Sequence, residues 1–216
     1  MIRIALTKGR IEKKAIEILG KAGYDCTELD EDKKGRKLLF KIANADIEIV
    51  LAKAADVITY VEHGVCDVGI VGADTIMEHG SNFYELLDLG FGKCRFALAG
   101  PAGGNFYDGY SHKIIASKYP NVAKNYFTSR GVDVEIVKIE GSVELAPLLG
   151  LADAIVDIVE TGSTLVANGL EVYEDIADIS ARLIVNVASI KLKKPELDSF
   201  IGKISVTLAA DVNEKE

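Results

Sequence analysis

The residues best suited to chemistry lie in one short segment, Asp157–Leu165, with the sequence DIVETGSTL. An apolar run precedes it and a helical pattern follows, so the segment joins the end of a strand to the start of a helix. A glycine lets the backbone approach a ligand, and hydroxyls donate hydrogen bonds, which suits a phosphate at a helix N-terminus. Thr161, Gly162, Ser163 and Thr164 would serve equally well as a helix cap, so the turn alone leaves both interpretations open.

Two carboxylates beside this turn indicate a ligand that is more than an anion. Asp157 lies at the carboxyl end of the predicted strand, the usual ligand edge of a parallel sheet, and Glu160 opens the turn. Carboxylates accept hydrogen bonds from sugar hydroxyls and bind Mg²⁺. The combination predicts a sugar phosphate, with Asp157 and Glu160 as candidate metal ligands and Asp153 as a further candidate.

Charged residues also follow other predicted strands. Lys8, Gly9 and Arg10 come after the first strand and are either a phosphate-binding loop or a solvated pair of cations. Asp74 is either a ligand for a base or a helix N-cap. Glu144 is either a site residue or an acid at a helix start.

Composition narrows the class of protein. The chain has 216 residues, and its net charge of -8 with no long basic run argues against a nucleic-acid-binding protein. We find no signal peptide and no stretch of about 18 apolar residues, so we expect a cytoplasmic protein without a membrane span. The isolated Cys26, Cys66 and Cys94 are typical of thiols in a reducing compartment. His63, His79 and His112 lack metal-ligand spacing.

Strand and helix patterns alternate along the chain, which predicts an α/β protein with mixed, largely parallel sheets. We expect two lobes, residues 1–93 with 182–216 and residues 94–181, joined by crossing strands. The expected strands are 2–6, 38–43, 46–52, 67–72, 94–100, 112–117, 132–139, 154–159, 170–176 and 181–189. The expected helices are 11–24, 54–63, one from Ala73, 119–130, 142–149, one after Thr161 and 195–209.

Longer blocks carry a resemblance to a known family. The block EGSVELAPLLGLADAIVDIVETGSTL (140–165) resembles the signature of the ATP phosphoribosyltransferases of histidine biosynthesis. The resemblance extends to ALTKGR (5–10), GRKLLF (35–40), DVITYVEHGVCDVGIVGADTI (56–76), LGFGKCRFALAGP (89–101) and NGLEVYEDI (168–176).

This resemblance implies a fold similar to type II periplasmic binding proteins, with a cleft between two lobes. It implies that N1 of ATP displaces pyrophosphate from phosphoribosyl pyrophosphate, with Mg²⁺. The chain looks like the short form of the family, which implies a regulatory subunit similar to histidyl-tRNA synthetase. We also expect a homodimer.

The resemblance also implies roles for individual residues. Arg36, Lys53 and Asp157 are expected to be catalytic, although relatives usually carry Arg where this chain has Lys53 and Pro where it has Thr7. ATP is expected to bind Lys8, Gly9, Arg10, Asp74 and Glu140. Phosphoribosyl pyrophosphate is expected to bind Asp153, Asp157, Glu160, Thr161, Gly162, Ser163 and Thr164.

Two other functions compete with this one. A type II periplasmic-like module that binds a small anion without catalysis would share the fold. A phosphoribosyltransferase of the type I fold would share the turn. The paired acids beside the turn argue against the first, and the KGR segment argues against the second.

Overall fold

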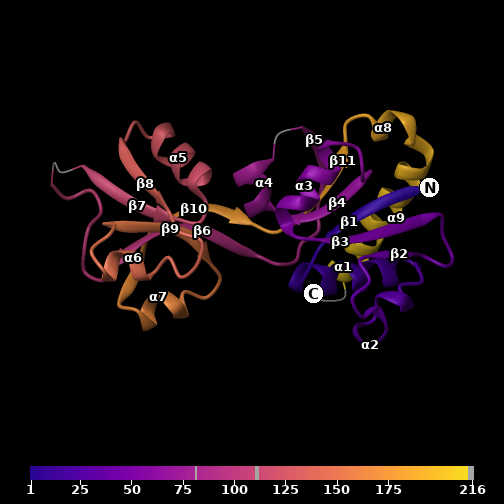
Figure 1. Ribbon diagram of the computed structural model, residues 1–216, viewed down its shortest axis with the longest axis horizontal. Helices are drawn as coiled ribbons and strands as arrows, with labels where there is room; N and C mark the ends of the chain where they lie inside the picture. The colour runs from indigo at the N-terminus through magenta and orange to yellow at the C-terminus, as the bar shows by residue number, and fades with distance from the viewer. Residues whose placement is uncertain (81, 110–111, 214–216) are drawn as a thin grey trace. The chain divides into compact units, whose positions relative to one another are not determined.

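The computed structural model describes residues 1–80, 82–109 and 112–213. The chain divides into two compact units (Figure 1). Met1–Gly92 and Ser180–Glu216 make up the first unit, and Lys93–Ile179 make up the second. The first unit is therefore discontinuous in sequence, and the second is inserted into it.

A mixed sheet forms the centre of the first unit. Its strands in the described residues are β1 (Ile2–Thr7), β2 (Leu39–Lys41), β3 (Ile47–Ala52), β4 (Val68–Gly72), β5 (Phe83–Asp88) and β11 (Ala181–Asn186). Their order across the sheet is β2-β3-β1-β4-β11-β5. β1 is parallel to β3 and β4, whereas β11 runs antiparallel between β4 and β5. The carboxyl ends of β3, β1 and β4 therefore share one edge.

Helices cover both faces of this sheet. They are α1 (Arg10–Lys21), the 3₁₀-helix η1 (Thr27–Leu29), α2 (Glu31–Lys34), α3 (Ala54–Glu62), α4 (Ala73–His79), α8 (Ser189–Leu192) and α9 (Lys194–Asn213). Alternate residues of a strand face opposite sides. Ile4 and Leu6 therefore join the core under α1 and α9, while Ala5 joins the core under α3. A Cβ on Gly69 would lie 2.9 Å from Val57, so only glycine lets α3 pack this closely on β4.

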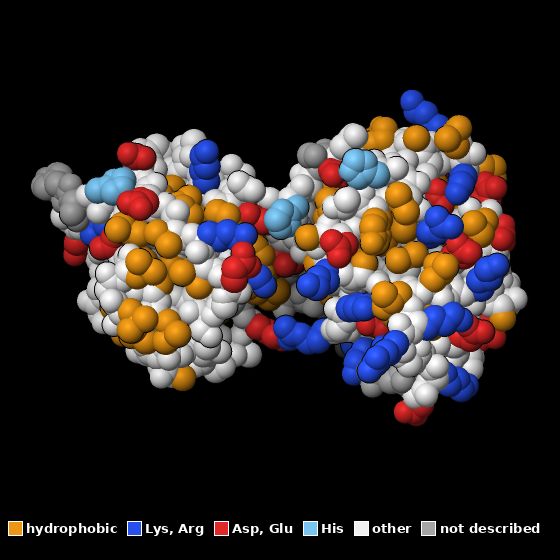
Figure 2. All heavy atoms as spheres, viewed as in Figure 1, with side chains coloured by type: hydrophobic (Ala, Val, Ile, Leu, Met, Phe, Trp, Pro, Cys, Tyr) orange, Lys and Arg blue, Asp and Glu red, His pale blue; other side chains and the backbone are white. Residues whose placement is uncertain are grey.

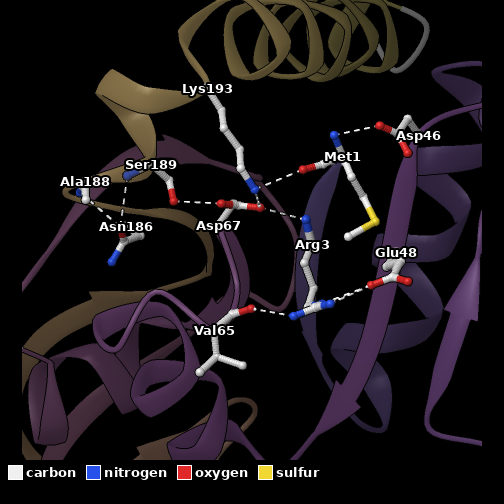
Figure 3. Close-up of polar contacts among 10 residues, drawn as sticks. All are labelled: Met1, Arg3, Asp46, Glu48, Val65, Asp67, Asn186, Ala188, Ser189 and Lys193. Carbon is white, nitrogen blue, oxygen red and sulfur yellow. Dashed lines mark hydrogen bonds and ion pairs between the residues drawn. The ribbon is translucent and has the colours of Figure 1, made fainter.

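A buried polar network ties the amino ends of these strands to the C-terminal segment (Figure 3). The carboxylate of Asp67 is 4% exposed and accepts hydrogen bonds from Lys193 Nζ, Ser189 Oγ and the Arg3 amide. The Arg3 guanidinium pairs with Glu48 at 2.8 Å. Buried charges of this kind are stable only when they are paired, as they are here. The network lies at the end of the strands opposite their carboxyl edge.

The second unit has its own mixed sheet. Its strands in the described residues are β6 (Cys94–Pro101), β7 (Lys113–Ser117), β8 (Val134–Lys138), β9 (Ala154–Val159) and β10 (Leu170–Ile179), in the order β10-β6-β9-β7-β8. β9, β7 and β8 are parallel, and β6 is antiparallel to β9 and β10. The helices are α5 (Pro120–Ser129), α6 (Leu145–Leu148) and α7 (Ser163–Ala167).

The predicted α/β fold is confirmed, with some differences in detail. Antiparallel pairs are more frequent than the alternation of strands and helices indicated, because β10, β11 and the short β2 and β5 run against their neighbours. β5, η1 and α2 were not predicted. The strand expected at 181–189 ends at Asn186, and α8 begins at Ser189. Within the described ranges, we find no helix with the length and apolar character needed to cross a membrane.

Candidate active site

The turn between β9 and α7 has open hydrogen-bond donors. Gly162 is the N-cap of α7 and adopts the left-handed conformation, with φ 78°. Thr161 Oγ1 lies 3.0 Å from Ser163 Oγ, and both side chains are exposed. The N-cap residue Gly162 has no side chain, and the Ser163 amide at the start of α7 donates a long hydrogen bond to Thr161 Oγ1 at 3.4 Å. The other N–H groups in the first turn of a helix have no acceptor within it. The exposed hydroxyls of this turn can therefore meet a ligand, while Thr161 also makes a local contact of the capping kind.

Asp157 is a half-buried carboxylate on the apolar face of β9. It alternates with Ile155 and Val159, which belong to the core under α6 and α7, and it lies opposite the small Ala97 of β6. Burial is the main cause that raises the pKa of Asp157 to about 6; the charge of Glu144 also raises the pKa, whereas the Ile158 N–H and the charge of Lys118 lower it. A partly desolvated carboxylate of this kind binds strongly to a hydroxyl donor or a cation.

The other predicted acids of this unit lie in different places. Glu160 is exposed in the turn itself. Asp153 lies at the opposite end of β9, where its carboxylate accepts a hydrogen bond from the Ile114 amide at 2.7 Å. Asp157 lies four positions further along the chain, roughly 13 Å away at the rise of a strand. Asp153 therefore joins β9 to β7 and does not lie with the turn.

Glu140 and Glu144 lie near the same edge of the second sheet. Glu140 is exposed beyond β8 and pairs with Lys138 at 2.7 Å, which lowers its pKa. Glu144 is the N-cap residue of α6, and in the described residues its side chain makes no capping hydrogen bond. Glu144 therefore lies at a helix start, as one of the two interpretations expected, and the negative charge of its carboxylate raises the pKa of Asp157.

In the first unit, the structure brings Lys8, Arg10 and Lys53 to one edge of the sheet. β1 and β3 are in parallel register, and the Lys8 amide donates to the Ala52 carbonyl at 2.9 Å. Lys8 and Lys53 therefore extend from neighbouring strand ends, and Arg10 begins α1 beside them. All three are exposed. Figure 2 shows Lys and Arg side chains gathered over the part of this unit that carries α1 and α2.

Glu12 and Lys34, which sequence reasoning missed, hold the loop of Lys8, Gly9 and Arg10 in place. Gly9 has φ 101°, and its amide donates to the Glu12 carboxylate at 3.1 Å. Glu12 is 4% exposed and also pairs with Lys34 at 2.7 Å. The pair connects the KGR loop to α2, which leads into Arg36. An acidic residue three positions after a helix N-cap is half of a capping box and was the available signal for Glu12.

Arg36 and Asp74 complete the set in the first unit. Arg36 is exposed in the turn before β2, and the Leu51 amide donates to the Leu38 carbonyl, so this segment runs beside the end of β3. Asp74 is the second residue of α4, whose N-cap is Gly72. A Cβ on Gly72 would overlap the Asp74 carboxylate. Asp74 therefore folds back over the strand end, and the helix-cap interpretation is wrong.

The acids of the turn suit Mg²⁺ in ligand type. Among the described residues we find no group of three or more His, Cys, Asp or Glu side chains arranged around one metal position. Mg²⁺ is commonly held by one or two carboxylates together with substrate phosphates. Asp157, a half-buried oxygen ligand that lies near Glu144, fits this arrangement.

A separate cavity of about 250 Å³ lies between α5 and β8. Its lining includes Phe127, Val134 and Ile136, with Lys124 and Asp133. None of the predicted site residues contributes to it. The candidate active site is therefore defined by strand ends and turns rather than by this cavity.

Solved structures first define the fold class. The periplasmic aliphatic sulphonate binding protein SsuA from Escherichia coli is 12% identical with a TM-score of 0.60, covering 99% of this chain and 74% of that chain. This level of identity shows the fold alone, which is that of type II periplasmic binding proteins.

Closer relatives define the family. A protein-family model described as ATP phosphoribosyltransferase (HisG) matches residues 53–206. An ATP phosphoribosyltransferase from Clostridium kluyveri is 63% identical over 207 residues, 96% of this chain and 94% of the relative. The ATP phosphoribosyl transferase (HisG:HisZ) complex from Thermotoga maritima is 35% identical with a TM-score of 0.82, covering 97% and 100% of the two chains.

The chain belongs to the ATP phosphoribosyltransferase family. It is a glycosyltransferase that moves phosphoribosyl from phosphoribosyl pyrophosphate to N1 of ATP, the first step of histidine biosynthesis. The non-catalytic binding module is not favoured.

Proposed function

We propose that the second unit holds phosphoribosyl pyrophosphate through the Thr161–Thr164 turn and Asp157. The turn would bind the 5′-phosphate with its amides and hydroxyls, and Asp157 would accept hydrogen bonds from the ribose hydroxyls. The observation that carries the proposal is a left-handed Gly162 between exposed hydroxyls, next to a half-buried carboxylate. Because α7 has only five residues, its dipole adds little, and local donors do the binding.

The first unit supplies the groups for ATP and for the leaving group. Lys8, Gly9 and Arg10 would bind ATP phosphates, and Asp74 would face the adenine. Glu140 of the second unit is a further candidate for ATP, although its ion pair with Lys138 would have to open. Arg36 and Lys53 would stabilise the departing pyrophosphate.

The reaction needs alignment and cations rather than a general base. The N1 lone pair forms a bond to C1 of the ribose as the C1–O bond breaks, and pyrophosphate leaves with the electron pair. Positive charge therefore grows on the ribose and negative charge on pyrophosphate. Cations placed beforehand lower the energy of this state, and positioning of N1 against C1 supplies much of the rest.

The required metal ion is Mg²⁺ in this proposal. Asp157 and Glu160 would hold it together with oxygens of phosphoribosyl pyrophosphate. When bound, it neutralises charge on the pyrophosphate. Support comes from the ligand type of these carboxylates and from the family, whose members generally use a metal ion.

We also propose that the chain is a short-form catalytic subunit. The Thermotoga maritima relative is a HisG:HisZ complex, which supports a hetero-oligomer with a regulatory subunit similar to histidyl-tRNA synthetase. A homodimer of the chain alone is expected. Because both substrates are metabolites of the cytoplasm, we place the protein there. Light scattering after size exclusion, with and without the regulatory subunit, tests both assemblies.

One assay tests the central proposal. Protein, ATP, phosphoribosyl pyrophosphate and Mg²⁺ are mixed, and phosphoribosyl-ATP is followed by ultraviolet absorbance, with and without the regulatory subunit. Product is expected to form, to stop with chelator and to return with Mg²⁺. Product formation by Asp157→Asn and Gly162→Val at the wild-type rate would refute the assignment of the site.

A further inference from the structure

Lys118 occupies a position in the second sheet to which the proposed function gives no role. It directly follows β7, which lies between β9 and β8 in the parallel part of the sheet. Ser117 is in register with Val156, so Lys118 lies beside Asp157 at the strand ends. Residues in register on parallel strands point to the same face. Lys118 therefore shares the face on which Asp157 lies.

Hydrogen bonds fix the backbone at this point. Ser117 is fully buried, and its hydroxyl donates to the Val156 carbonyl at 2.6 Å while it accepts from the Tyr119 amide at 2.9 Å. Tyr119 packs edge-on against Phe96, with ring centroids 4.9 Å apart. The two residues that flank Lys118 are thus anchored, and only its long side chain is free to follow a ligand.

Lys118 is a cation among acids. Its charge lowers the pKa of both Asp157 and Glu140, and Glu144 lies close to Asp157. Within the described residues Lys118 has no ion-pair partner; its Nζ lies 5.8 Å from the centroid of the Tyr119 ring. Lys138, by contrast, is paired with Glu140. The Thr161–Thr164 turn offers only neutral donors, so Lys118 adds a positive charge beside Asp157, where Lys138 is already neutralised by Glu140.

The proposed function places the 5′-phosphate and the pyrophosphate of the substrate on different sides of Asp157. From the end of β9, α7 packs toward β10, where Leu165 and Leu170 share one core. Lys118 lies on the other side of β9, toward β8. In phosphoribosyl pyrophosphate the 5′-phosphate and the pyrophosphate leave the ribose at opposite ends. With the 5′-phosphate in the turn and the ribose at Asp157, the pyrophosphate points toward Lys118.

We propose that Lys118 binds the pyrophosphate of phosphoribosyl pyrophosphate, an assignment that rests on the proposed function of the turn. A lysine suits this task because its ammonium is a mobile point charge that can stay with a group as it departs. Negative charge increases on pyrophosphate when the C1–O bond breaks, so the contact strengthens in the transition state.

Ligands that carry only part of the substrate separate the two roles. We expect Lys118→Met to weaken binding of phosphoribosyl pyrophosphate, and product inhibition by pyrophosphate, by about 10- to 100-fold. Binding of ribose 5-phosphate, which lacks the pyrophosphate, should not change. Lys118→Arg should keep most of the affinity, and Lys124→Met on α5 is a control for loss of one exposed lysine.

Either of two results would overturn the assignment. Pyrophosphate inhibition of Lys118→Met at the wild-type level would show that Lys118 does not bind this group. An equal loss of affinity for ribose 5-phosphate would show that it acts on the turn or the ribose. Failure of the turn assignment has a different signature, because Gly162→Val would then bind ribose 5-phosphate normally.

Discussion

The carboxylate of Asp67 accepts a hydrogen bond from Lys193 Nζ at 2.8 Å, across 126 positions of sequence. The pair joins the residue before β4 to the connection between α8 and α9. Ser189 and the Arg3 amide complete the shell of donors. The start of β1 and the C-terminal helices are therefore held through one carboxylate.

Asp67→Asn should lower the free energy of unfolding at pH 7 by about 2–3 kcal/mol, because it leaves buried donors poorly paired. Burial raises the pKa of Asp67, but the hydrogen bonds from Lys193, Ser189 and Arg3 outweigh it and leave the pKa below its ordinary value. The stabilisation is therefore complete above the ordinary pKa and is lost as pH falls through the folded pKa.

Urea unfolding at pH 7 and at about pH 3 measures both effects for Asp67→Asn. The difference in the free energy of unfolding between Asp67→Asn and wild type should be smaller at the lower pH. Asp46→Asn is the matched control, since this exposed carboxylate has no ion pair within residues 1–80, 82–109 and 112–213 other than that with the N-terminus, and its loss should change stability by less than about 0.5 kcal/mol. Equal effects of the two substitutions would contradict the prediction.

Gly162→Val should raise KM for phosphoribosyl pyrophosphate strongly, by tenfold or more, with a smaller effect on KM for ATP. The left-handed backbone at φ 78° costs a β-branched residue about 1–2 kcal/mol, so the turn would change shape. Steady-state kinetics with each substrate varied provides the measurement. Gly202→Ala, in the middle of α9 with no atom near the added Cβ, should leave kinetics unchanged and slightly increase stability.

Asp157→Asn should lower kcat and weaken the response to Mg²⁺, while it stabilises the protein. The pKa of about 6 lies above the ordinary value of 3.8, so the folded state binds this proton more tightly than the unfolded state. Ionisation therefore costs stability between about pH 4 and pH 6, and the full cost remains at higher pH.

Without ligands or metal at pH 8, Asp157→Asn should thus unfold with a free energy roughly 1–3 kcal/mol higher than wild type. At about pH 4 the two proteins should differ little. Thermal unfolding across this pH range, combined with steady-state kinetics, tests whether Asp157→Asn gains stability while it loses turnover. A variant with both lower stability and wild-type turnover would assign Asp157 to structure alone.

Lys53→Ala should lower kcat by about 10²-fold, since the leaving group would lose a cation in the transition state. Lys53→Arg should keep or increase activity, because a guanidinium binds phosphate oxygens through two donors. Single-turnover rates compare these variants without product release. Lys41→Ala, on an exposed position of β2, controls for the loss of one charge in this unit. Normal turnover by Lys53→Ala would rule out a role in catalysis.

Strands that are buried on both faces were readily predicted from the sequence, and the exposed edge strand β5 was not. β1, β3 and β4 are buried on both faces and therefore appear as continuous apolar runs. β5 is an edge strand with mostly exposed side chains, so FYELLD has no apolar face that alternates. β11, although buried, pairs with strands more than 90 residues away, and no local pattern predicts its place between β4 and β5.

In the candidate site, features formed by neighbouring residues were predictable from the sequence, and contacts between distant segments were not. The turn at Gly162 is local and could be predicted from its residue types. Asp153 lies only four residues from Asp157, but a strand separates them, so proximity in sequence was misleading. Glu12 depends on Lys34, and Lys118 gains its neighbour Asp157 from the order of the strands. These contacts depend on the order of the strands and the path of the chain, which cannot be inferred from the spacing of residues in the sequence.

The insertion of the second unit also sets an order for folding during synthesis. β5 ends at Asp88 and the chain leaves the first unit after Gly92, whereas β11, which lies between β4 and β5, begins only at Ala181. While the ribosome makes the residues between them, the first sheet lacks β11, and the apolar β4 is paired with β1 on one side only. Residues 93–179 contain their own sheet and core, so the second unit can become complete first. The nascent chain would thus expose the unpaired edge of β4 until the residues from Ala181 onward emerge, a period in which association with a chaperone would matter most.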